Sequence, residues 1–332
     1  MRKFIGLIVL GAAPLLAVGS LRAATDPPAW AYAITPPAPA GARPAQPAEP
    51  EHDPEALLQV PGSTKRFTLK QIENSNEPAD WFPEDHPVMP EVVAKGRAGS
   101  GVRACSYCHM PNGKGRPSNG PAAGLPVSYF IEQLNDFKNG NRKPADARKT
   151  NVNQMIAIAK AMTPEEMTTA AEYFGSMKWT PWIRVVETNT VPKTRIEGSI
   201  YYTLPGNEKE PIGMRIIEVP ENNEQTEPLR NPRSGFVAYA PVGSIKKGEA
   251  LVTTGGNGRT VACGICHGPD LRGMGPVPHI AGRSPSYLVR QMYDMQAGTR
   301  HGEWSSLMKP VVDKLTNEDF VNVAAYVSSR MP

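Results

Sequence analysis

The chain has 332 residues, with 36 lysine and arginine residues against 32 aspartate and glutamate residues. The formal net charge of +4 falls to +1 (4 minus 3) without the three basic residues of the first 24. This near balance excludes a polycation that binds nucleic acid through bulk charge, so no nucleic-acid partner is expected.

The N-terminus has the three features of a secretory signal peptide. Met1-Arg2-Lys3 is a basic start, residues 4–18 are apolar, and small residues follow around residues 21–24. We therefore expect a signal peptide over residues 1–24, cleaved near Ala23 or Ala24. The apolar run falls short of the ~20 residues that span a bilayer, although an uncleaved anchor stays open as an alternative. No later run is long enough, so the sequence predicts no transmembrane segment in the mature chain.

Residues 25–61 are rich in alanine and hold ten prolines. Such a stretch cannot bury a core, so we expect a semi-rigid, partly polyproline II tether there. An irregular acidic segment over residues 62–94 follows, because its proline spacing forbids a regular helix. We expect Trp81 and Phe82 in this segment to be buried against the next domain, and His86 to be a packing or surface residue.

The pentapeptide C-x-x-C-H occurs twice and contains all four cysteines of the chain. This is the c-type haem attachment pattern. Two thiols three positions apart can reach the two vinyl groups of one porphyrin, and the adjacent histidine can bind the iron. A redox disulfide or half of a zinc site would explain a lone C-x-x-C, but not a histidine after both copies. The copies are Cys105-Ser-Tyr-Cys108-His109 and Cys263-Gly-Ile-Cys266-His267.

The pattern therefore predicts two covalently attached haem c groups as cofactors. Covalent haem attachment belongs on the outer side of a bacterial inner membrane, which agrees with the predicted export. We expect the mature protein to be periplasmic.

The two motifs belong to a longer internal repeat. An offset of 158 residues carries Ala123 onto Ala281 and Arg142 onto Arg300. After an insertion near residues 145–151 in the first copy, the offset becomes 153. Two homologous haem domains, over residues 95–180 and 245–332, follow from this match.

Each copy also carries signals for two helices. A middle helix is expected to begin near Ser128 and near Ser286. A C-terminal helix is expected after the capping boxes Thr163-Pro-Glu-Glu166 and Thr316-Asn-Glu-Asp319, where apolar residues follow at helical spacing.

The repeat also identifies the sixth ligand of each iron. Among the methionines inside the two copies, only Met155 and Met308 match each other. A thioether at that position can approach the iron from the face opposite the histidine. The predicted axial pairs are His109 with Met155 and His267 with Met308.

The other candidate ligands are weaker. Met292 and Met295 match Leu134 and Phe137 of the first copy, which indicates packing residues. His279 and His301 match Pro121 and Lys143, so neither is repeated. His52 and His86 remain as further alternatives for a histidine pair.

Residues 181–244 are too long for an ordinary linker. Runs of β-branched and aromatic residues predict a small β-rich insertion that braces the two haem domains, with a partner-docking arm as the alternative. The turn residues Pro205-Gly206-Asn207 predict a hairpin between residues 196–204 and 214–219. In the second domain, the glycine-rich residues 253–259 lack the ending of a phosphate loop and are expected to form a turn.

Residues 95–180 and 245–332 resemble class I cytochrome c domains, and their tandem order resembles the di-haem cytochromes of the cytochrome c4 type. The resemblance rests on the C-x-x-C-H motifs, the Ala-Gly and Ser-Tyr pairs, the Gly-x-Arg near the end of the middle helix, and the methionine before a capped helix. It implies a mainly α fold of two tandem domains, with the β-rich insertion and the irregular, proline-rich N-terminal arm as additions. It also implies electron transfer as the activity.

The expected function is a periplasmic carrier that passes single electrons from a dehydrogenase or quinol-linked donor to an acceptor such as a terminal oxidase or another cytochrome. Iron held by both histidine and methionine has no open position for substrate, so no catalytic residues are expected. The alternative is a di-haem enzyme, peroxidase-like or thiosulfate-oxidising, in which one iron can open. A cytochrome subunit of a dehydrogenase complex would also be an electron-transfer protein. Arg142 and Arg300 are expected either to pair with haem propionates or to form surface salt bridges.

Overall fold

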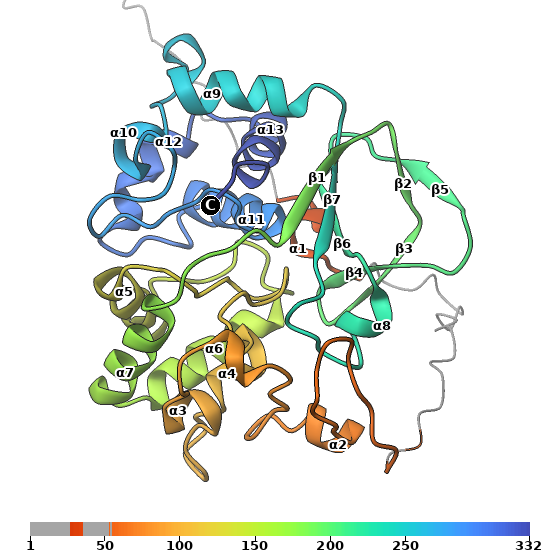
Figure 1. Cartoon of the computed structure of the whole chain (residues 1–332). Coiled ribbons are helices and arrows are strands. Elements are labelled where there is room, and N and C mark those ends of the chain that lie inside the picture. Colours follow the sequence, from red (N-terminus) through yellow and green to blue (C-terminus); the bar gives the residue numbers. More distant parts are fainter. Residues whose placement is uncertain (1–26, 36–52, 54) are drawn as a thin grey trace, which may run out of the picture.

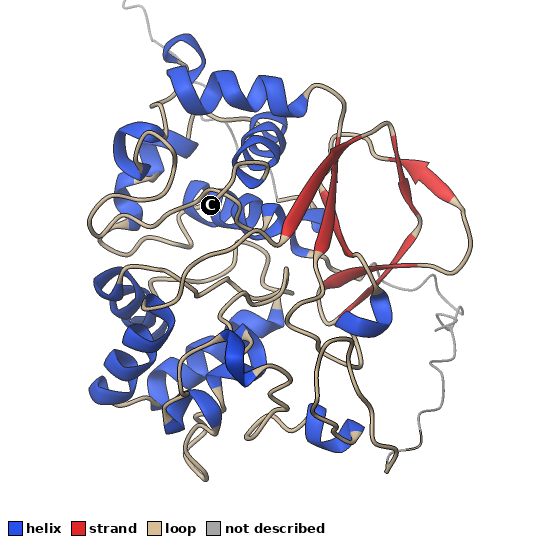
Figure 2. Cartoon of the chain, viewed as in Figure 1, coloured by secondary structure: helices blue, strands red, loops and turns tan. Residues whose placement is uncertain are grey.

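The computed structural model describes residues 27–35, 53 and 55–332. The predicted signal peptide and most of the predicted tether lie outside these residues. Two helical units lie one above the other, and short strands lie beside them (Figures 1 and 2). Within the described ranges, no helix combines the length and the apolar character needed to cross a membrane.

The two helical units follow the repeat in the sequence. The first contains α3 (Glu91–Ala94), α4 (Cys105–His109), α5 (Val127–Asn139), α6 (Thr150–Ala161) and α7 (Pro164–Gly175). The second contains α9 (Ser244–Gly258), α10 (Gly264–His267), α11 (Pro285–Gln296), the 3-10 helix η2 (Ser305–Leu307), α12 (Lys309–Val312) and α13 (Asn317–Ser328). The middle helices α5 and α11 begin within one residue of their predicted starts.

Both predicted capping boxes are present. The Thr163 hydroxyl accepts the Glu166 amide at 3.2 Å, and the Glu166 carboxylate accepts the Thr163 amide at 2.8 Å. Thr316 and Asp319 make the same pair of bonds at 3.2 and 2.9 Å. These bonds satisfy amides that the first turn of α7 and α13 cannot satisfy itself, which explains why both helices begin there.

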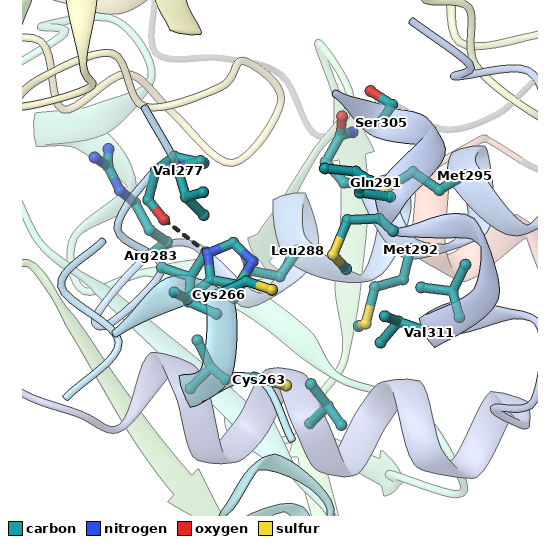
Figure 3. A pocket seen from close by; sticks show the side chains of 18 of the residues that line it. Cys263, Cys266, Val277, Arg283, Leu288, Gln291, Met292, Met295, Ser305 and Val311 are labelled. Carbon is teal, nitrogen blue, oxygen red and sulfur yellow. Dashed lines mark hydrogen bonds between the residues drawn. The ribbon is translucent and has the colours of Figure 1, made fainter. Parts of the chain in front are cut away.

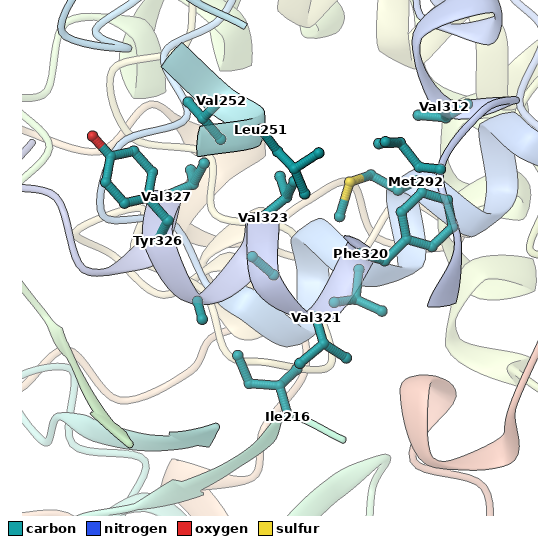
Figure 4. Packing of buried hydrophobic residues seen from close by; sticks show 14 of the residues in the cluster. Ile216, Leu251, Val252, Met292, Val312, Phe320, Val321, Val323, Tyr326 and Val327 are labelled. Carbon is teal, nitrogen blue, oxygen red and sulfur yellow. The ribbon is translucent and has the colours of Figure 1, made fainter. Parts of the chain in front are cut away.

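The core of the second unit forms where α9 and α13 cross (Figure 4). Leu251 and Val252 of α9 are buried against Phe320, Val323 and Val327 of α13. The regular part of α9 ends at Thr254, because Gly255, Gly256 and Asn257 have left-handed backbone angles. The glycine-rich stretch is therefore a turn, as predicted.

Strands between the two units form one three-stranded sheet and two ribbons (Figure 2). The sheet has the order β1 (Ile183–Glu187), β7 (Phe236–Ala240), β6 (Ile217–Pro220), with β7 parallel to β1 and antiparallel to β6. The ribbons pair β2 (Thr190–Pro192) with β5 (Lys209–Pro211), and β3 (Thr194–Glu197) with β4 (Ile200–Thr203).

The predicted hairpin across Pro205–Asn207 is wrong. The hairpin is β3–β4, and its turn is made by Gly198 and Ser199, which have φ of 53° and 61°. Two positive φ angles in a two-residue loop match the twist of the strands. β6 pairs instead with β7, the central strand of the sheet, which the sequence pattern did not reveal.

The strand segment contacts both helical units. Trp182, Tyr202 and Phe236 are buried in the core of the first unit. Ile216 and Ala240 are buried in the core of the second. In addition, the Ser284 hydroxyl before α11 donates to the buried Glu218 carboxylate of β6 at 2.6 Å. The segment thus contributes residues to both cores, and its bracing role stays a prediction.

Trp81 and Phe82 are buried, but not in the core of the first unit as predicted. They form a separate cluster with Val60, Ile72 and Leu229, near α2 (Leu69–Ile72) and the 3-10 helix η1 (Pro83–Asp85). The Trp81 indole donates to Leu229 O at 2.7 Å, so its partner comes from the segment after α8 (Asn223–Thr226). A pairing across 148 residues leaves no local sequence signal.

The prediction of a coreless tether is wrong for residues 29–32. They form α1 (Ala29–Tyr32), and Ala31 and Tyr32 are buried in the core of the second unit. The Tyr32 hydroxyl donates to Asp294 of α11 at 2.7 Å. The proline-rich composition hid this short segment because its aromatic residues, unlike the prolines around them, can fill a core.

Candidate functional site

All eight predicted haem-binding residues line two cavities, four residues in each. The first cavity, of about 160 Å³, is lined by Cys105, Cys108, His109 and Met155. The second cavity, of about 220 Å³, is lined by Cys263, Cys266, His267 and Met308. Each cavity is therefore lined by one predicted set of four residues, and no residue of the first set lines the second cavity or the reverse.

The short helices α4 and α10 place the cysteines and the histidine of each motif. Residues three apart lie on the same side of a helical turn, so both thiols of a motif face one cavity, as Figure 3 shows for Cys263 and Cys266. None of the four cysteines forms a disulfide. The residue after the histidine of each motif ends the short helix with a positive φ, which is 63° at Met110 and 83° at Gly268. The backbone of Met110 is strained in this conformation, because Met110 has a side chain where Gly268 has none.

Each histidine is oriented by a backbone carbonyl. His109 Nδ1 lies 2.8 Å from Gly120 O, and His267 Nδ1 lies 2.8 Å from Pro278 O. A carbonyl can only accept, so Nδ1 donates and Nε2 keeps its lone pair. Burial lowers the pKa of both imidazoles. Both rings are thus held as neutral ligands of the kind that bind iron.

The two methionines reach their cavities from different local structures. Met155 lies within α6, whereas Met308 lies between η2 and α12. Both are partly buried and pack against the core of their own unit. Met292 and Met295, predicted as packing residues, belong to the second core but also line the second cavity (Figure 3).

The charge of the cavity linings fits an anionic ligand. Among the described residues, the first lining contains five lysine and arginine side chains and one carboxylate, Asp294. The second contains two arginines, Arg283 and Arg300, and no carboxylate. Haem is a flat apolar ring with two propionate carboxylates. Apolar walls, paired thiols, a neutral imidazole, a thioether and excess positive charge therefore fit haem c in both cavities.

The two cavities share one wall. Five residues line both of them: Pro121, Leu125, Tyr129, Tyr287 and Gln291. Tyr129 and Tyr287 lie on the middle helices α5 and α11, and the 158-residue offset of the repeat carries one onto the other. That match was the sequence signal for the shared wall, although it did not show that both tyrosines line both cavities.

Arg142 and Arg300 cross between the units rather than forming surface salt bridges. Arg142 donates to the Tyr287 hydroxyl at 2.9 Å, and Arg300 donates to the Tyr129 hydroxyl at 2.9 Å. The two arginines also pair with each other through an antiparallel backbone bridge. Both line a cavity, so they lie where haem propionates could be reached.

The two C-x-x-C-H motifs differ in their exposure to solvent. The Arg230 guanidinium lies 4.2 Å above the Tyr107 ring and donates to Tyr107 O, so the interdomain segment covers the first motif. In the second motif, Cys266 is exposed and Ile265 is 66% exposed. The second motif is therefore the one open to solvent.

Of the alternative histidine ligands, only His279 lines a cavity within the described residues. Burial, and next the positive charge of Arg283, lower the pKa of His279 to about 3. His301 is exposed, and His86 bonds to Asp80 and Tyr173. His52 lies outside the described residues.

The depressed pKa of His279 predicts acid sensitivity. The His279 imidazole binds a proton near pH 6.5 in the unfolded chain but only near pH 3 in the folded chain. The free energy of unfolding therefore has its full value above pH 6.5 and decreases as the pH falls toward 3. The slope is at most about 1.4 kcal/mol per pH unit. In denaturant titrations at pH 7 and pH 5, His279→Gln should lose less stability on acidification than the wild type. His301→Gln, at an exposed position, is the control, and equal losses in both variants would contradict the prediction.

Comparisons with known proteins agree with this site. Residues 93–178 match the family profile described as Cytochrome c. Cytochrome c-554(548) of Halomonas halodenitrificans is 36% identical over 76 residues, 23% of this chain and 92% of that protein. Cytochrome c4 of Azotobacter vinelandii is 38% identical over 84 residues, 23% of this chain but only 40% of that protein. The thiosulfate dehydrogenase electron acceptor of Thiomonas intermedia is 24% identical over 232 residues, 68% of this chain and 78% of that protein.

The match to the Halomonas protein spans nearly all of a c-type cytochrome, and it accompanies two C-x-x-C-H motifs, each at its own cavity. The chain therefore belongs to the cytochrome c family and carries two covalently bound haem c groups.

Proposed function

We propose that the protein is an electron carrier with one haem c in each cavity. Cys105 and Cys108 attach the first haem, and His109 and Met155 are its axial ligands. Cys263 and Cys266 attach the second haem, with His267 and Met308 as axial ligands. The observation that carries the proposal is that each set lines its own cavity and that the two cavities share a wall.

Haem c supplies reversible one-electron chemistry at its iron. The protein holds each imidazole neutral and oriented through Gly120 O or Pro278 O. The thioether ligands raise the reduction potential relative to a second histidine, and the apolar linings raise it further. With both axial positions filled by side chains, no position remains for a substrate, which favours a carrier over an enzyme.

The shared wall supports electron transfer between the two haems within one chain. Tyr129 and Tyr287 are held there by arginines from the opposite unit, so the two cavities have a fixed separation. We propose that electrons enter from a dehydrogenase or quinol-linked donor and leave to an acceptor such as a terminal oxidase or another cytochrome. The similarity to a thiosulfate dehydrogenase electron acceptor makes a periplasmic dehydrogenase the first donor to test.

An optical spectrum with a haem count tests the carrier proposal. We expect two haems per chain and a full-strength methionine–iron(III) band near ~695 nm in the oxidised protein. The double variant Cys105→Ala/Cys108→Ala should retain one haem and half of this band. A high-spin haem in the wild type that binds cyanide or peroxide would contradict the proposal, and it would favour the peroxidase-like alternative.

A further inference from the structure

Lys149 lies in the segment that distinguishes the two helical units. It directly precedes α6 and falls within the insertion near residues 145–151 that the second copy lacks. Its side chain lines the first cavity, and the residue is only 1% exposed. The lining of the second cavity contains no lysine among the described residues. Any role of this ammonium therefore concerns one cavity and not the other.

The Lys149 ammonium has no hydrogen-bond partner among the described residues. Burial lowers the pKa of Lys149, and the positive charge of Arg290 lowers it further. A buried ammonium without a counter-ion is strongly disfavoured, so the charged form of Lys149 is favoured when a ligand brings further negative charge beside it.

No carboxylate of the described lining bonds to this ammonium, and the negative charge of Asp294 only partly offsets the effect of burial on the pKa of Lys149. Asp294 is the one carboxylate in the lining that is described, and it already accepts from the Tyr32 hydroxyl at 2.7 Å and from the Ala145 amide at 2.8 Å. The neighbouring arginines have partners of their own. Arg290 donates to Pro117 O at 2.5 Å, and Arg142 donates to Gln133 at 2.9 Å. Lys149 is thus a donor without an acceptor among the described residues, and an anionic ligand of the first cavity can supply one.

We propose that Lys149 binds a propionate carboxylate of the haem in the first cavity and raises the reduction potential of that haem. The inference rests on the proposed function, since it requires haem in this cavity. An ammonium that neutralises a propionate removes a negative charge near the iron. Reduction adds an electron to the iron, so removing that negative charge favours the reduced state. The second haem has no such lysine, and the two haems acquire different potentials.

A spectroelectrochemical titration of the full-length holoprotein tests this. Lys149→Met and Lys149→Gln remove the charge, and Lys149→Arg keeps it. Lys160→Met removes an exposed lysine near the end of α6. We expect loss of the Lys149 charge to lower one midpoint potential and leave the other unchanged. The equilibrium constant for electron sharing between the haems should change about tenfold, which is about 59 mV for one electron. Lys149→Arg and Lys160→Met should keep both wild-type potentials.

The pH dependence of the potential separates propionate binding from a purely structural role. Without the ammonium, the propionate pKa rises toward neutrality, so the lowered potential should fall further as the pH increases through that pKa. Unchanged potentials in both Lys149→Met and Lys149→Gln would overturn the inference, as would equal shifts in Lys149→Arg. A wild-type protein without two low-spin haems would instead overturn the proposed function, which the haem count and spectrum report separately.

Discussion

Replacing Met308 with alanine is expected to open the sixth position of one iron while the other stays closed. Met308 is partly buried at the end of η2 and lines the second cavity. The band near ~695 nm should fall to half strength, because only the first haem would keep a thioether. One midpoint potential should fall by a sizeable fraction of the roughly 0.8 V range that axial ligation spans. Near-infrared spectra and a redox titration measure both effects.

Met292 and Met295 provide matched controls for this experiment. Both line the second cavity, and both are buried, at 8% exposure. Met292→Leu and Met295→Leu keep the apolar volume, so the band should stay at full strength in both. Should one of these variants halve the band while Met308→Ala preserves it, the assignment of Met308 as ligand would be wrong.

Replacing Gly248 with valine is expected to destabilise the second helical unit strongly. Gly248 is buried where α9 crosses α13, and a Cβ there would lie 2.0 Å from Asn322 O and 2.7 Å from Tyr326 Cβ. These atoms belong to the α13 backbone and to the base of a side chain, so they cannot move aside without separating the helices. Overpacking of a core typically costs about 1–3 kcal/mol and sometimes more, and we expect at least about 3 kcal/mol here.

Ala250→Val is the matched control for Gly248→Val, because it adds a branched side chain on the exposed face of the same helix. Its effect should be the small loss of helix propensity, well under about 1 kcal/mol. Denaturant titration followed by the absorbance of each haem would measure both variants. If the two variants lose similar stability, the close contact between α9 and α13 does not limit the fold.

Features that depend on neighbouring residues could be predicted from the sequence. The capping boxes of α7 and α13 and the turn at Gly255–Asn257 use bonds or backbone angles within a few residues, so their signals are local. The internal repeat also allowed a prediction beyond neighbouring residues, because residues that match between the two copies are expected to have the same role in each domain. It selected one methionine in each copy, and each of the two lines the cavity of its own motif.

Features that depend on distant partners could not be predicted in this way. The burial of Tyr32 depends on Asp294, 262 residues away, and the burial of Trp81 depends on Leu229. Likewise, the parallel pairing of β1 with β7 joins strands separated by most of the interdomain segment. Such pairs form wherever the folded chain brings complementary groups together. The two partners are not separated by a regular number of residues, so no sequence pattern predicts the pairing.

The sequence by itself determined the cofactor pattern, the duplication and the starts of the C-terminal helices, because these follow from side-chain chemistry at fixed short spacing. Only the tertiary structure decided that the two cavities share Tyr129 and Tyr287, and that the second motif is open while Arg230 covers the first. It also decided that Lys149 is buried with no hydrogen-bond partner in the part of the chain that is described. The physical reason is that burial and charge environment are set by every segment that surrounds a residue, and most of those segments are distant along the chain.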